Sequence, residues 1–380
     1  MKKTLGIYLM TAGILMGFYL VFNVYLTPVV AELAVPGNVA QDFRSAQYVA
    51  QDFSPANIGR SEDLRYTLSK ASFATTVVAK YDRPEPRKSA TASSPFAVPD
   101  GLKKEVDFWT KIYAEYTTDQ AVLHDPSDLG NVYGVIDLPH CDDPPTKECL
   151  ASREDTLNTA KAEYADKLGL EKKSKKVVKS SYQGKKRKGK KRVRTVTIET
   201  VPLIRGQVGQ RDKFLQGIYY SEGLLPQIEE LFSGYDIPQE LTRLPFVESM
   251  FNIKARSRSG AQGIWQLMPS TARILGLKVG HGIDERTDPI KATHAAAKHL
   301  RRDYNRLGSW PLALNAYNTG PGRISGAINQ LGTKDIVKII KNYQGTGYGF
   351  AGRNFYPCFL AALRVYENRL QYFQELVPVN

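Results

Sequence analysis

One acidic side chain lies in an unusually apolar stretch of the chain. Glu248 occupies the fifth position of the segment LPFVESMF, residues 244–251. Such surroundings withhold water from the charged form of a carboxyl, which raises its pKa and suits it to donate a proton near neutral pH. Taken alone, the pattern is better explained by a carboxylate at the polar edge of an amphipathic helix.

Three later segments carry the amides, hydroxyls and aromatic rings that hydrogen-bond to sugars and stack on them. Residues 257–269 read SRSGAQGIWQLMP, a loop punctuated by glycine. Residues 316–322 read AYNTGPG, a helix-to-turn junction, and residues 353–357 read RNFYP. Each motif is weak by itself, but together they favour a functional role for Glu248 over the structural one.

In this order and spacing, the motifs resemble the lytic transglycosylase domain of the goose-lysozyme-like superfamily, and most of all the membrane-bound lytic murein transglycosylase D family. The resemblance covers residues 205–375, about 45% of the chain. It implies a mainly α, lysozyme-like fold that cleaves the β-1,4 bond between N-acetylmuramic acid and N-acetylglucosamine in peptidoglycan. It implies neither a metal nor another cofactor.

The resemblance also implies roles for individual residues. Glu248 matches the catalytic acid of the family, and Gln266 matches the glutamine that lines the sugar site. The other positions expected to contact or shape the substrate site are Ser257, Ser259, Tyr317 and Asn318.

The fourth family motif fits less well. An ungapped match places Phe355 where the family has a tyrosine, and Tyr356 follows one position later. One residue on a helix turns a side chain by about 100°. We expect Tyr356 to take the role of the family's tyrosine from this neighbouring position. Trp265 is equally compatible with stacking on sugar and with filling the core.

A single carboxylate is consistent with this chemistry. Most glycosidases use two, but no Asp or Glu occurs between Glu248 and Asp284. In the family mechanism the sugar's own C6 hydroxyl replaces water and closes a 1,6-anhydro ring. Asp284, Glu285 and Asp288 are expected to be helix caps and loop charges. If one of them folded back toward Glu248, a hydrolytic muramidase would remain an alternative, as would a non-enzymatic wall-binding protein.

The N-terminus predicts export. Lys2 and Lys3 precede 27 uncharged residues, 5–31, enough to span a bilayer of about 30 Å. We expect residues 1–36 to be a signal anchor or a signal peptide, which places the chain in the bacterial envelope on the periplasmic side. Residues 37–100 are expected to be a flexible tether, 101–170 a small accessory region, 171–200 a basic linker and 201–380 the catalytic domain.

Charge is concentrated in one place. Residues 171–194 carry 13 Lys or Arg against one Glu, which supplies +12 of the net +14. The run is either a solvated linker or a segment that binds an anionic surface such as lipid headgroups or cell-wall polymer. Its only aromatic residue is Tyr182, which provides no platform for stacking bases and disfavours nucleic acid. A membrane-tethered polyanion binder is the alternative that rests on this run alone.

The cysteines and histidines suggest no metal site. In an exported chain Cys141 and Cys149 could close a small disulfide loop, although free thiols stay open, and Cys358 is expected in the core. The five histidines show no ligand spacing.

Helix signals fill the C-terminal region. Asp236 is expected to cap one helix, and Asp288 to begin another that stops at Gly308. Further helices are predicted over residues 210–232, 310–329, 333–343 and 355–376. No alternating strand pattern occurs after residue 201, so this region is predicted to be all-α.

Overall fold

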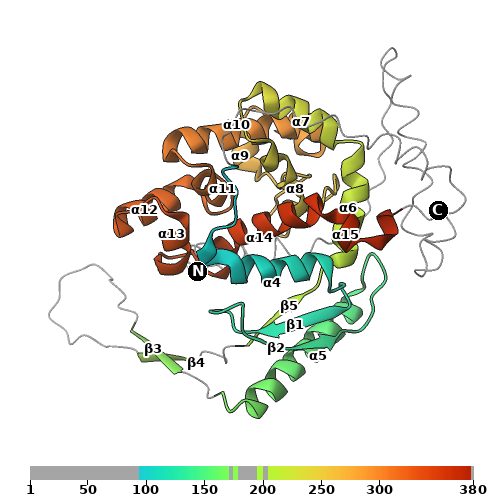
Figure 1. Ribbon diagram of the computed structural model, residues 1–380, viewed down its shortest axis with the longest axis vertical. Helices are drawn as coiled ribbons and strands as arrows, with labels where there is room; N and C mark the ends of the chain where they lie inside the picture. Colours follow the sequence, from blue (N-terminus) through green and yellow to red (C-terminus); the bar gives the residue numbers. More distant parts are fainter. Residues whose placement is uncertain (1–93, 171–173, 179–194, 200–203, 378–380) are drawn as a thin grey trace, which may run out of the picture.

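The computed structural model describes residues 94–170, 174–178, 195–199 and 204–377 (Figure 1). The expected signal or anchor segment, nearly all of the expected tether and most of the basic run lie outside these residues. Within the described ranges, every helix is too short or too polar to cross a bilayer.

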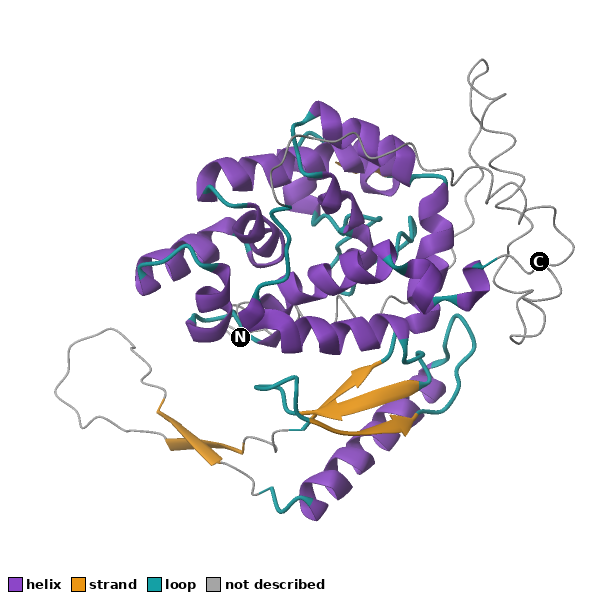
Figure 2. Ribbon diagram, viewed as in Figure 1, coloured by secondary structure: helices purple, strands orange, loops and turns teal. Residues whose placement is uncertain are grey.

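Most of the described chain is helical, as the sequence predicted (Figure 2). The helices are α4 (Lys103–Ala114), α5 (Lys147–Lys167), α6 (Arg211–Glu222), α7 (Leu225–Gly234), α8 (Pro245–Glu248), α9 (Pro269–Ile274), α10 (Pro289–Leu307), α11 (Trp310–Thr319), α12 (Pro321–Leu331), α13 (Ile336–Asn342), α14 (Phe350–Glu367) and α15 (Arg369–Tyr372). Short 3₁₀ turns span Asp100–Leu102, Gln239–Arg243, Glu285–Thr287 and Gln374–Leu376.

Helix α14 is buried along most of its length, and α4 packs along it. The Trp109 indole donates a hydrogen bond to Asn354 Oδ1 at 3.0 Å, and the rings of Phe96 and Phe359 lie 5.2 Å apart. One hydrophobic core therefore includes α4 and the helices of residues 211–367. From the sequence, α4 was expected to belong to a separate accessory region, residues 101–170. The division of the chain into domains stays a prediction.

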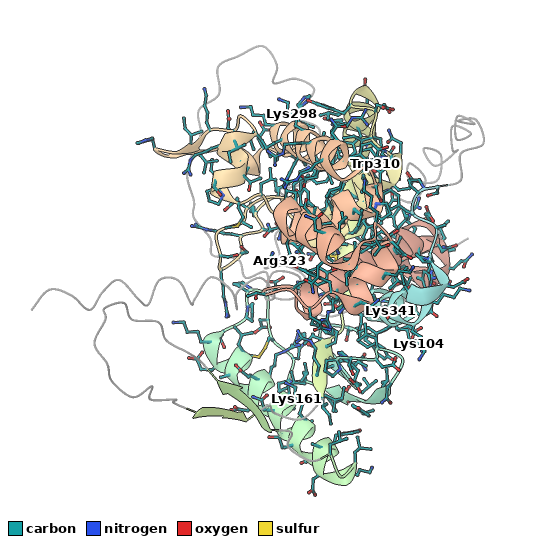
Figure 3. The ribbon with its side chains drawn as sticks, turned by 90° about the vertical axis from the view of Figure 1, so that its left-hand side faces the viewer. Lys104, Lys161, Lys298, Trp310, Arg323 and Lys341 are labelled. Carbon is teal, nitrogen blue, oxygen red and sulfur yellow. A yellow bond between two sulfur atoms is a disulfide. The ribbon has the colours of Figure 1, made fainter. Side chains whose placement is uncertain are left out.

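A three-stranded antiparallel sheet lies beside the helical core. Its central strand β1 (Gln120–His124) pairs with β2 (Val132–Asp137) and with β5 (Arg205–Val208). Helix α5 covers this sheet. In Figure 3, Lys298 of α10 lies in the upper part of the view and Lys161 of α5 in the lower part.

The prediction that residues after 201 are all-α is wrong in detail. Strand β5 and the short pair β6 (Val279–Gly280) and β7 (Ile283–Asp284) lie there. The β5 sequence RGQV has no apolar alternation, and its ladder with β1 supplies the backbone partners that make it a strand. At the ends of the expected basic linker, β3 (Ser174–Val178) pairs with β4 (Thr195–Glu199).

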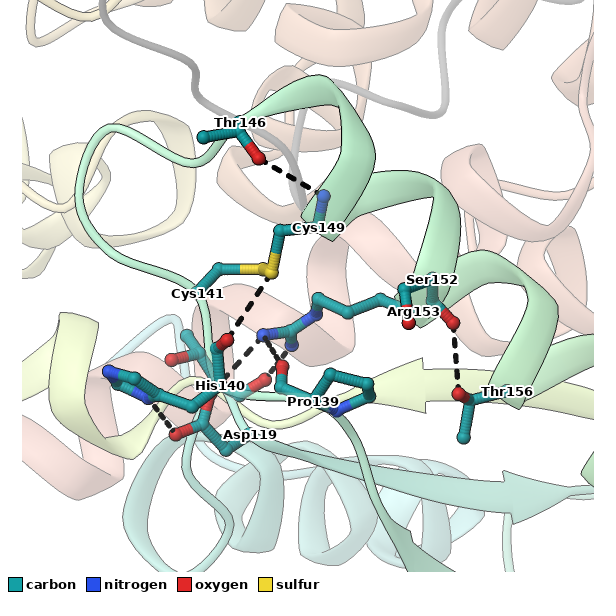
Figure 4. Close-up of a disulfide and its surroundings, with 10 residues drawn as sticks. Asp119, Pro139, His140, Cys141, Thr146, Cys149, Ser152, Arg153 and Thr156 are labelled. Carbon is teal, nitrogen blue, oxygen red and sulfur yellow. Dashed lines mark hydrogen bonds and ion pairs between the residues drawn. A yellow bond between two sulfur atoms is a disulfide. The ribbon is translucent and has the colours of Figure 1, made fainter.

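The disulfide that was expected in an exported chain is present (Figure 4). Cys141 and Cys149 form a disulfide with their Cα atoms 5.9 Å apart. The Thr146 hydroxyl caps α5 by accepting from the Cys149 amide at 3.1 Å. Nearby, Arg153 reaches the carbonyl of Pro139 at 3.2 Å. Cys358 is buried in α14, as expected.

Helix boundaries were predicted well where capping chemistry is strong. Asp288 Oδ1 accepts from the amides of Ile290 and Lys291 at 3.0 Å, and α10 ends at Gly308 with φ 72°. The predicted helix over 310–329 is divided into α11 and α12 at Gly320, whose φ is 85°.

Asp236 does not cap a helix. Its φ is 52°, and its carboxylate pairs with Arg301 at 2.9 Å. The segment that follows is a 3₁₀ turn rather than the first turn of a long helix.

Candidate active site

Glu248 is the last residue of the four-residue helix α8, whose other members are buried. Its side chain is 8% exposed. Neither carboxylate oxygen has a hydrogen-bond partner among the described residues, and neither is completely enclosed. Burial alone raises the pKa of this carboxyl to about 8, because no neighbouring donor or cation compensates for the lost water. The group is therefore a neutral acid at pH 7 that still reaches the protein surface.

The chain turns sharply after Glu248. Met250 and Phe251 have φ of 51° and 58°, in the left-handed region that L-residues rarely adopt. The Ser249 hydroxyl donates to the Ile264 carbonyl at 2.9 Å and so ties this turn to the 257–269 loop. A Cβ at Gly217 of α6 would lie 3.0 Å from the Met250 carbonyl, so a glycine allows α6 to approach the turn closely.

The side-chain amide of Gln266 uses its nitrogen in hydrogen bonds and leaves its oxygen without a partner. Its Nε2 donates to the carbonyls of Ala255 at 3.1 Å and Gly263 at 2.9 Å, while Oε1 is buried with no partner. Its own φ is 45°. At Gly263, φ is 76° and a Cβ would lie 1.9 Å from the Arg286 carbonyl, so only glycine fits. The unpaired Oε1 is an acceptor oriented by the loop itself.

The two serines of the loop contact each other. Their hydroxyl oxygens are 3.1 Å apart, and Ser257 Oγ also accepts from the Ala261 amide at 2.8 Å. Ser257 is buried and Ser259 is half-buried. In this structure Ser257 stabilises the turn, and Ser259 is the more accessible of the two hydroxyls.

Tyr317 joins the AYN motif to the same loop. Its hydroxyl donates to the Trp265 carbonyl at 2.7 Å. Burial raises its pKa well above the ordinary value, and the negative charge of Glu248 adds to the effect, so the phenol and the carboxyl are neighbours. Asn318 is half-buried and makes no side-chain hydrogen bond to another described residue.

Trp265 is a core residue in this structure. It is fully buried, stacks on Phe232 with ring centroids 5.4 Å apart, and donates from Nε1 to Thr293 Oγ1 at 2.8 Å. Since its ring has no exposed face, the sugar-stacking interpretation is wrong.

Phe355 and Tyr356 both lie in α14 and both are buried. Tyr356 is 1% exposed, and burial raises the pKa of its phenol. Its hydroxyl makes no hydrogen bond to a described residue, which leaves it available. The neighbouring Asn354 is occupied by Trp109 and the Phe350 carbonyl.

The three acids considered as possible partners of Glu248 are engaged elsewhere. Asp284 forms an ion pair with Arg286 at 2.6 Å, and Glu285 forms one with Lys291 at 2.9 Å. Asp288 caps α10. Their expected roles as caps and loop charges are confirmed.

Sequence reasoning missed two buried polar groups close to the site. On α4, Tyr113 is fully buried, and its pKa is raised by burial, by Cys358 and by the charge of Glu248. On α10, Asp303 is 1% exposed beside His299. No sequence motif connected either residue with Glu248.

Other site types find no support in the described ranges. No group of three or more His, Cys, Asp or Glu side chains there is arranged to hold a metal ion. An open surface hollow of about 860 Å³ is lined by α5 and Ile136 of β2, so it draws on none of the motif residues.

Comparison with known proteins confirms the resemblance. Residues 231–340 match the family model described as the transglycosylase SLT domain. Membrane-bound lytic murein transglycosylase D of Escherichia coli (strain K12) is 44% identical over 95 residues, 24% of this chain and 21% of that protein. Membrane-bound lytic murein transglycosylase F of Shewanella sediminis is 29% identical over 182 residues, 41% of this chain and 36% of that protein.

A third relative and one solved structure extend the comparison. A putative tributyltin chloride resistance protein of Alteromonas sp. (strain M-1) is 36% identical over 100 residues, 26% of this chain and 48% of that protein. An inactive mutant of the lytic transglycosylase Slt from Pseudomonas aeruginosa aligns with a TM-score of 0.33 and 21% identity, over 42% of this chain and 26% of that one.

The matches are partial. The chain spans between about a fifth and about a half of the length of these curated relatives. The family model includes Glu248, Gln266 and Tyr317 but ends before Phe355 and Tyr356. It also covers less of the chain than the 205–375 range expected from the motifs.

Proposed function

We propose that this protein is a peptidoglycan lytic transglycosylase. It cleaves the β-1,4 bond between N-acetylmuramic acid and N-acetylglucosamine and forms a 1,6-anhydro-muramic acid end. The observation that carries the proposal is the Glu248 carboxyl, which is nearly buried, partnerless and held neutral, within the segment that matches the transglycosylase SLT domain. The relatives named as lytic murein transglycosylases support the substrate class.

In the proposed mechanism Glu248 acts first as an acid and then as a base. With a pKa of about 8 it is protonated at pH 7 and donates its proton to the glycosidic oxygen as the bond to the anomeric carbon breaks. The acetamido group of the muramic acid stabilises that carbon. The Glu248 carboxylate then accepts the proton of the C6 hydroxyl, whose oxygen bonds to the anomeric carbon. Glu248 is thereby protonated again, and no water is consumed.

The C6 hydroxyl competes well with water because it belongs to the same sugar. A well-oriented intramolecular group can act at an effective concentration of about 10⁵ M or more. The loss of hydration around Glu248 works in the same direction, because a site with little water favours the internal nucleophile.

The other site residues bind the glycan in this proposal. Gln266 is proposed to line the glycan site, where its buried Oε1 keeps unused acceptor capacity. Ser259, Asn318 and Tyr356 offer polar groups with unused capacity, while Ser257 and Tyr317 hold the loop in place.

A hydrolytic muramidase on the same fold would need a second group to activate water. Asp284, Glu285 and Asp288 are engaged in ion pairs or capping. Asp303 lies 3.4 Å from His299 Nε2 and is 1% exposed, so it is engaged away from the substrate as well. The engagement of these acids favours the transglycosylase over the hydrolase.

Product analysis tests the proposal. Purified peptidoglycan sacculi are digested with wild-type protein, Glu248→Gln and the control Glu230→Gln, whose exposed carboxyl lies on α7. Mass spectrometry of the products should show anhydro-muropeptides with wild type and with Glu230→Gln and none with Glu248→Gln. Reducing ends in place of anhydro ends would identify a hydrolase, and wall binding without any cleavage would identify a non-enzymatic protein.

We propose further that the protein works in the periplasm, at the inner membrane or released from it, with residues 1–36 as anchor or signal peptide. The names of the relatives as membrane-bound enzymes support this placement. Residues 171–194 are proposed to bind an anionic surface, and nucleic acid is not an expected partner. Replacing the Lys and Arg residues of 185–194 with serine leaves β3 and β4 intact. It should weaken binding to anionic vesicles most at low salt, with turnover of soluble glycan strands unchanged.

A further inference from the structure

A buried polar pair lies where α10 meets α11. His299 Nε2 is 3.4 Å from Asp303 Oδ2, and the two side chains are one helical turn apart on the inward face of α10. The remaining buried residues of that face are mostly alanine and leucine. Beyond this electrostatic contact and Arg302 Nε at 3.8 Å from Asp303 Oδ1, neither Asp303 oxygen nor His299 Nδ1 has a hydrogen-bond partner. Burying such groups is costly, and an apolar pair would fill the same space without that cost.

The pair contacts the AYN motif. The His299 ring packs on the Tyr317 ring with centroids 4.9 Å apart. The Tyr317 hydroxyl in turn donates to the Trp265 carbonyl, which belongs to the peptide group that enters Gln266. Thr293, six residues before His299 on α10, accepts a hydrogen bond from the Trp265 indole. Helix α10 therefore holds the residue before Gln266 at two points, directly through Thr293 and indirectly through His299 and Tyr317.

Gln266 needs such support. Its φ of 45° is a left-handed conformation that is strained for a residue other than glycine. A residue that lines a binding site contributes fully only if its turn is already fixed, because ordering the turn on binding would weaken the affinity.

We propose that His299 and Asp303 are positioning residues for the glycan site: Asp303 orients the His299 ring, the ring fixes Tyr317, and Tyr317 fixes the turn that presents Gln266. The proposal rests on the proposed function for the identity of the ligand. It adds two residues to the site that touch no substrate.

The charge state of the pair agrees with this arrangement. Burial lowers the pKa of His299 to about 4, so the imidazole is neutral at pH 7 and carries one N–H. Burial raises the pKa of Asp303 to about 6, against the opposing effect of Arg302 and Arg306. A proton on Nε2 points that N–H at Asp303 and leaves Nδ1 bare, which matches the partnerless Nδ1.

The experiment compares His299→Leu, Asp303→Leu and Asp303→Asn with a matched control. Tyr304→Leu removes a ring from the same α10–α11 seam, where Tyr304 stacks on Trp310 at 4.1 Å (Trp310 is labelled in Figure 3). Kinetics are measured on soluble uncrosslinked peptidoglycan strands, well below each variant's melting temperature. His299→Leu and Asp303→Leu should raise KM by about tenfold and change kcat by less than about threefold. Asp303→Asn, which keeps an acceptor for Nε2–H, should recover most of the loss, and Tyr304→Leu should leave KM unchanged.

Two further measurements keep the test decisive. In a Glu248→Gln background, binding of the same strands by calorimetry should weaken by the same factor as KM rises. His299→Leu should add little to Tyr317→Phe, because both act through one contact. If His299→Leu does not fold, the KM values of Asp303→Leu and Asp303→Asn are compared with that of wild type instead. KM effects equal to those of Tyr304→Leu, or full additivity with Tyr317→Phe, would overturn the inference. Absence of turnover by wild type would instead refute the proposed function, and the binding measurement would still decide the role of the pair.

Discussion

Replacing Glu248 with glutamine should stabilise the protein, and the gain should grow with pH. The carboxyl has a pKa of about 8 in the folded chain and an ordinary value of 4.5. Between these two values the folded state binds more protons than the unfolded state, so stability falls as pH rises. At about 1.4 kcal/mol per pH unit, the wild type loses at most about 3 kcal/mol by pH 7 and about 5 kcal/mol above pH 8.

Glutamine has nearly the same shape as glutamate and does not titrate. The unfolding free energy of the variant therefore does not fall with pH in this way. The assay is urea unfolding of wild type, Glu248→Gln and Glu230→Gln at intervals between pH 5 and pH 9. All other groups titrate alike in the three proteins and cancel in the difference. The free-energy difference between Glu248→Gln and wild type should rise steadily to about pH 8 and then level off. A difference that stays flat across this range would refute the argument that burial alone sets the state of this carboxyl.

Three other outcomes are expected. Because the acid form of Glu248 is required, kcat/KM on soluble glycan strands should fall about tenfold per pH unit above pH 8, and activity sustained to pH 10 would contradict this role. Replacing both Cys141 and Cys149 with serine should lower the unfolding free energy by about 2–3 kcal/mol without changing kcat. Urea unfolding with and without reductant measures this difference. Equal unfolding free energies of wild type and variant would show that the disulfide does not stabilise the fold. Tyr113→Phe should change the unfolding free energy by less than about 1 kcal/mol, since the buried hydroxyl makes no hydrogen bond of good geometry. Tyr348→Phe should lower the unfolding free energy by about 1–2 kcal/mol, because it removes the donor to Asn315 Oδ1.

The parts of the fold that could be predicted depend on local chemistry. Asp288 and Gly308 bound α10 because a capping carboxylate and a left-handed glycine act within one turn. Glu248 stood out because its apolar neighbours adjoin it in sequence. The disulfide was open to prediction because only eight positions separate the two cysteines.

The parts that could not be predicted depend on contacts between distant segments. The four residues of β5 form a strand because β1, some 80 positions earlier, offers a free edge. The sugar-stacking interpretation of Trp265 failed because Phe232 of α7 and Thr293 of α10 enclose the ring. Asp303 carries no sequence signal at all, since an Asp four residues after a His on a helix is usually a surface pair. Only the depth of α10 in the core makes this one unusual.

The packing of α4 along α14 has a consequence for how the chain responds to cleavage. A protease that cuts after Lys or Arg has many targets in residues 185–194, between the two segments that carry these helices. A chain nicked there would still hold its two pieces together through the Trp109–Asn354 bond, the Phe96–Phe359 contact and the Arg364–Asp107 ion pair at 2.6 Å. It should migrate as two bands under denaturing conditions and as one species under native conditions. Conversely, the matched stretch 231–340 produced alone would lack both helices and leave a large apolar surface uncovered.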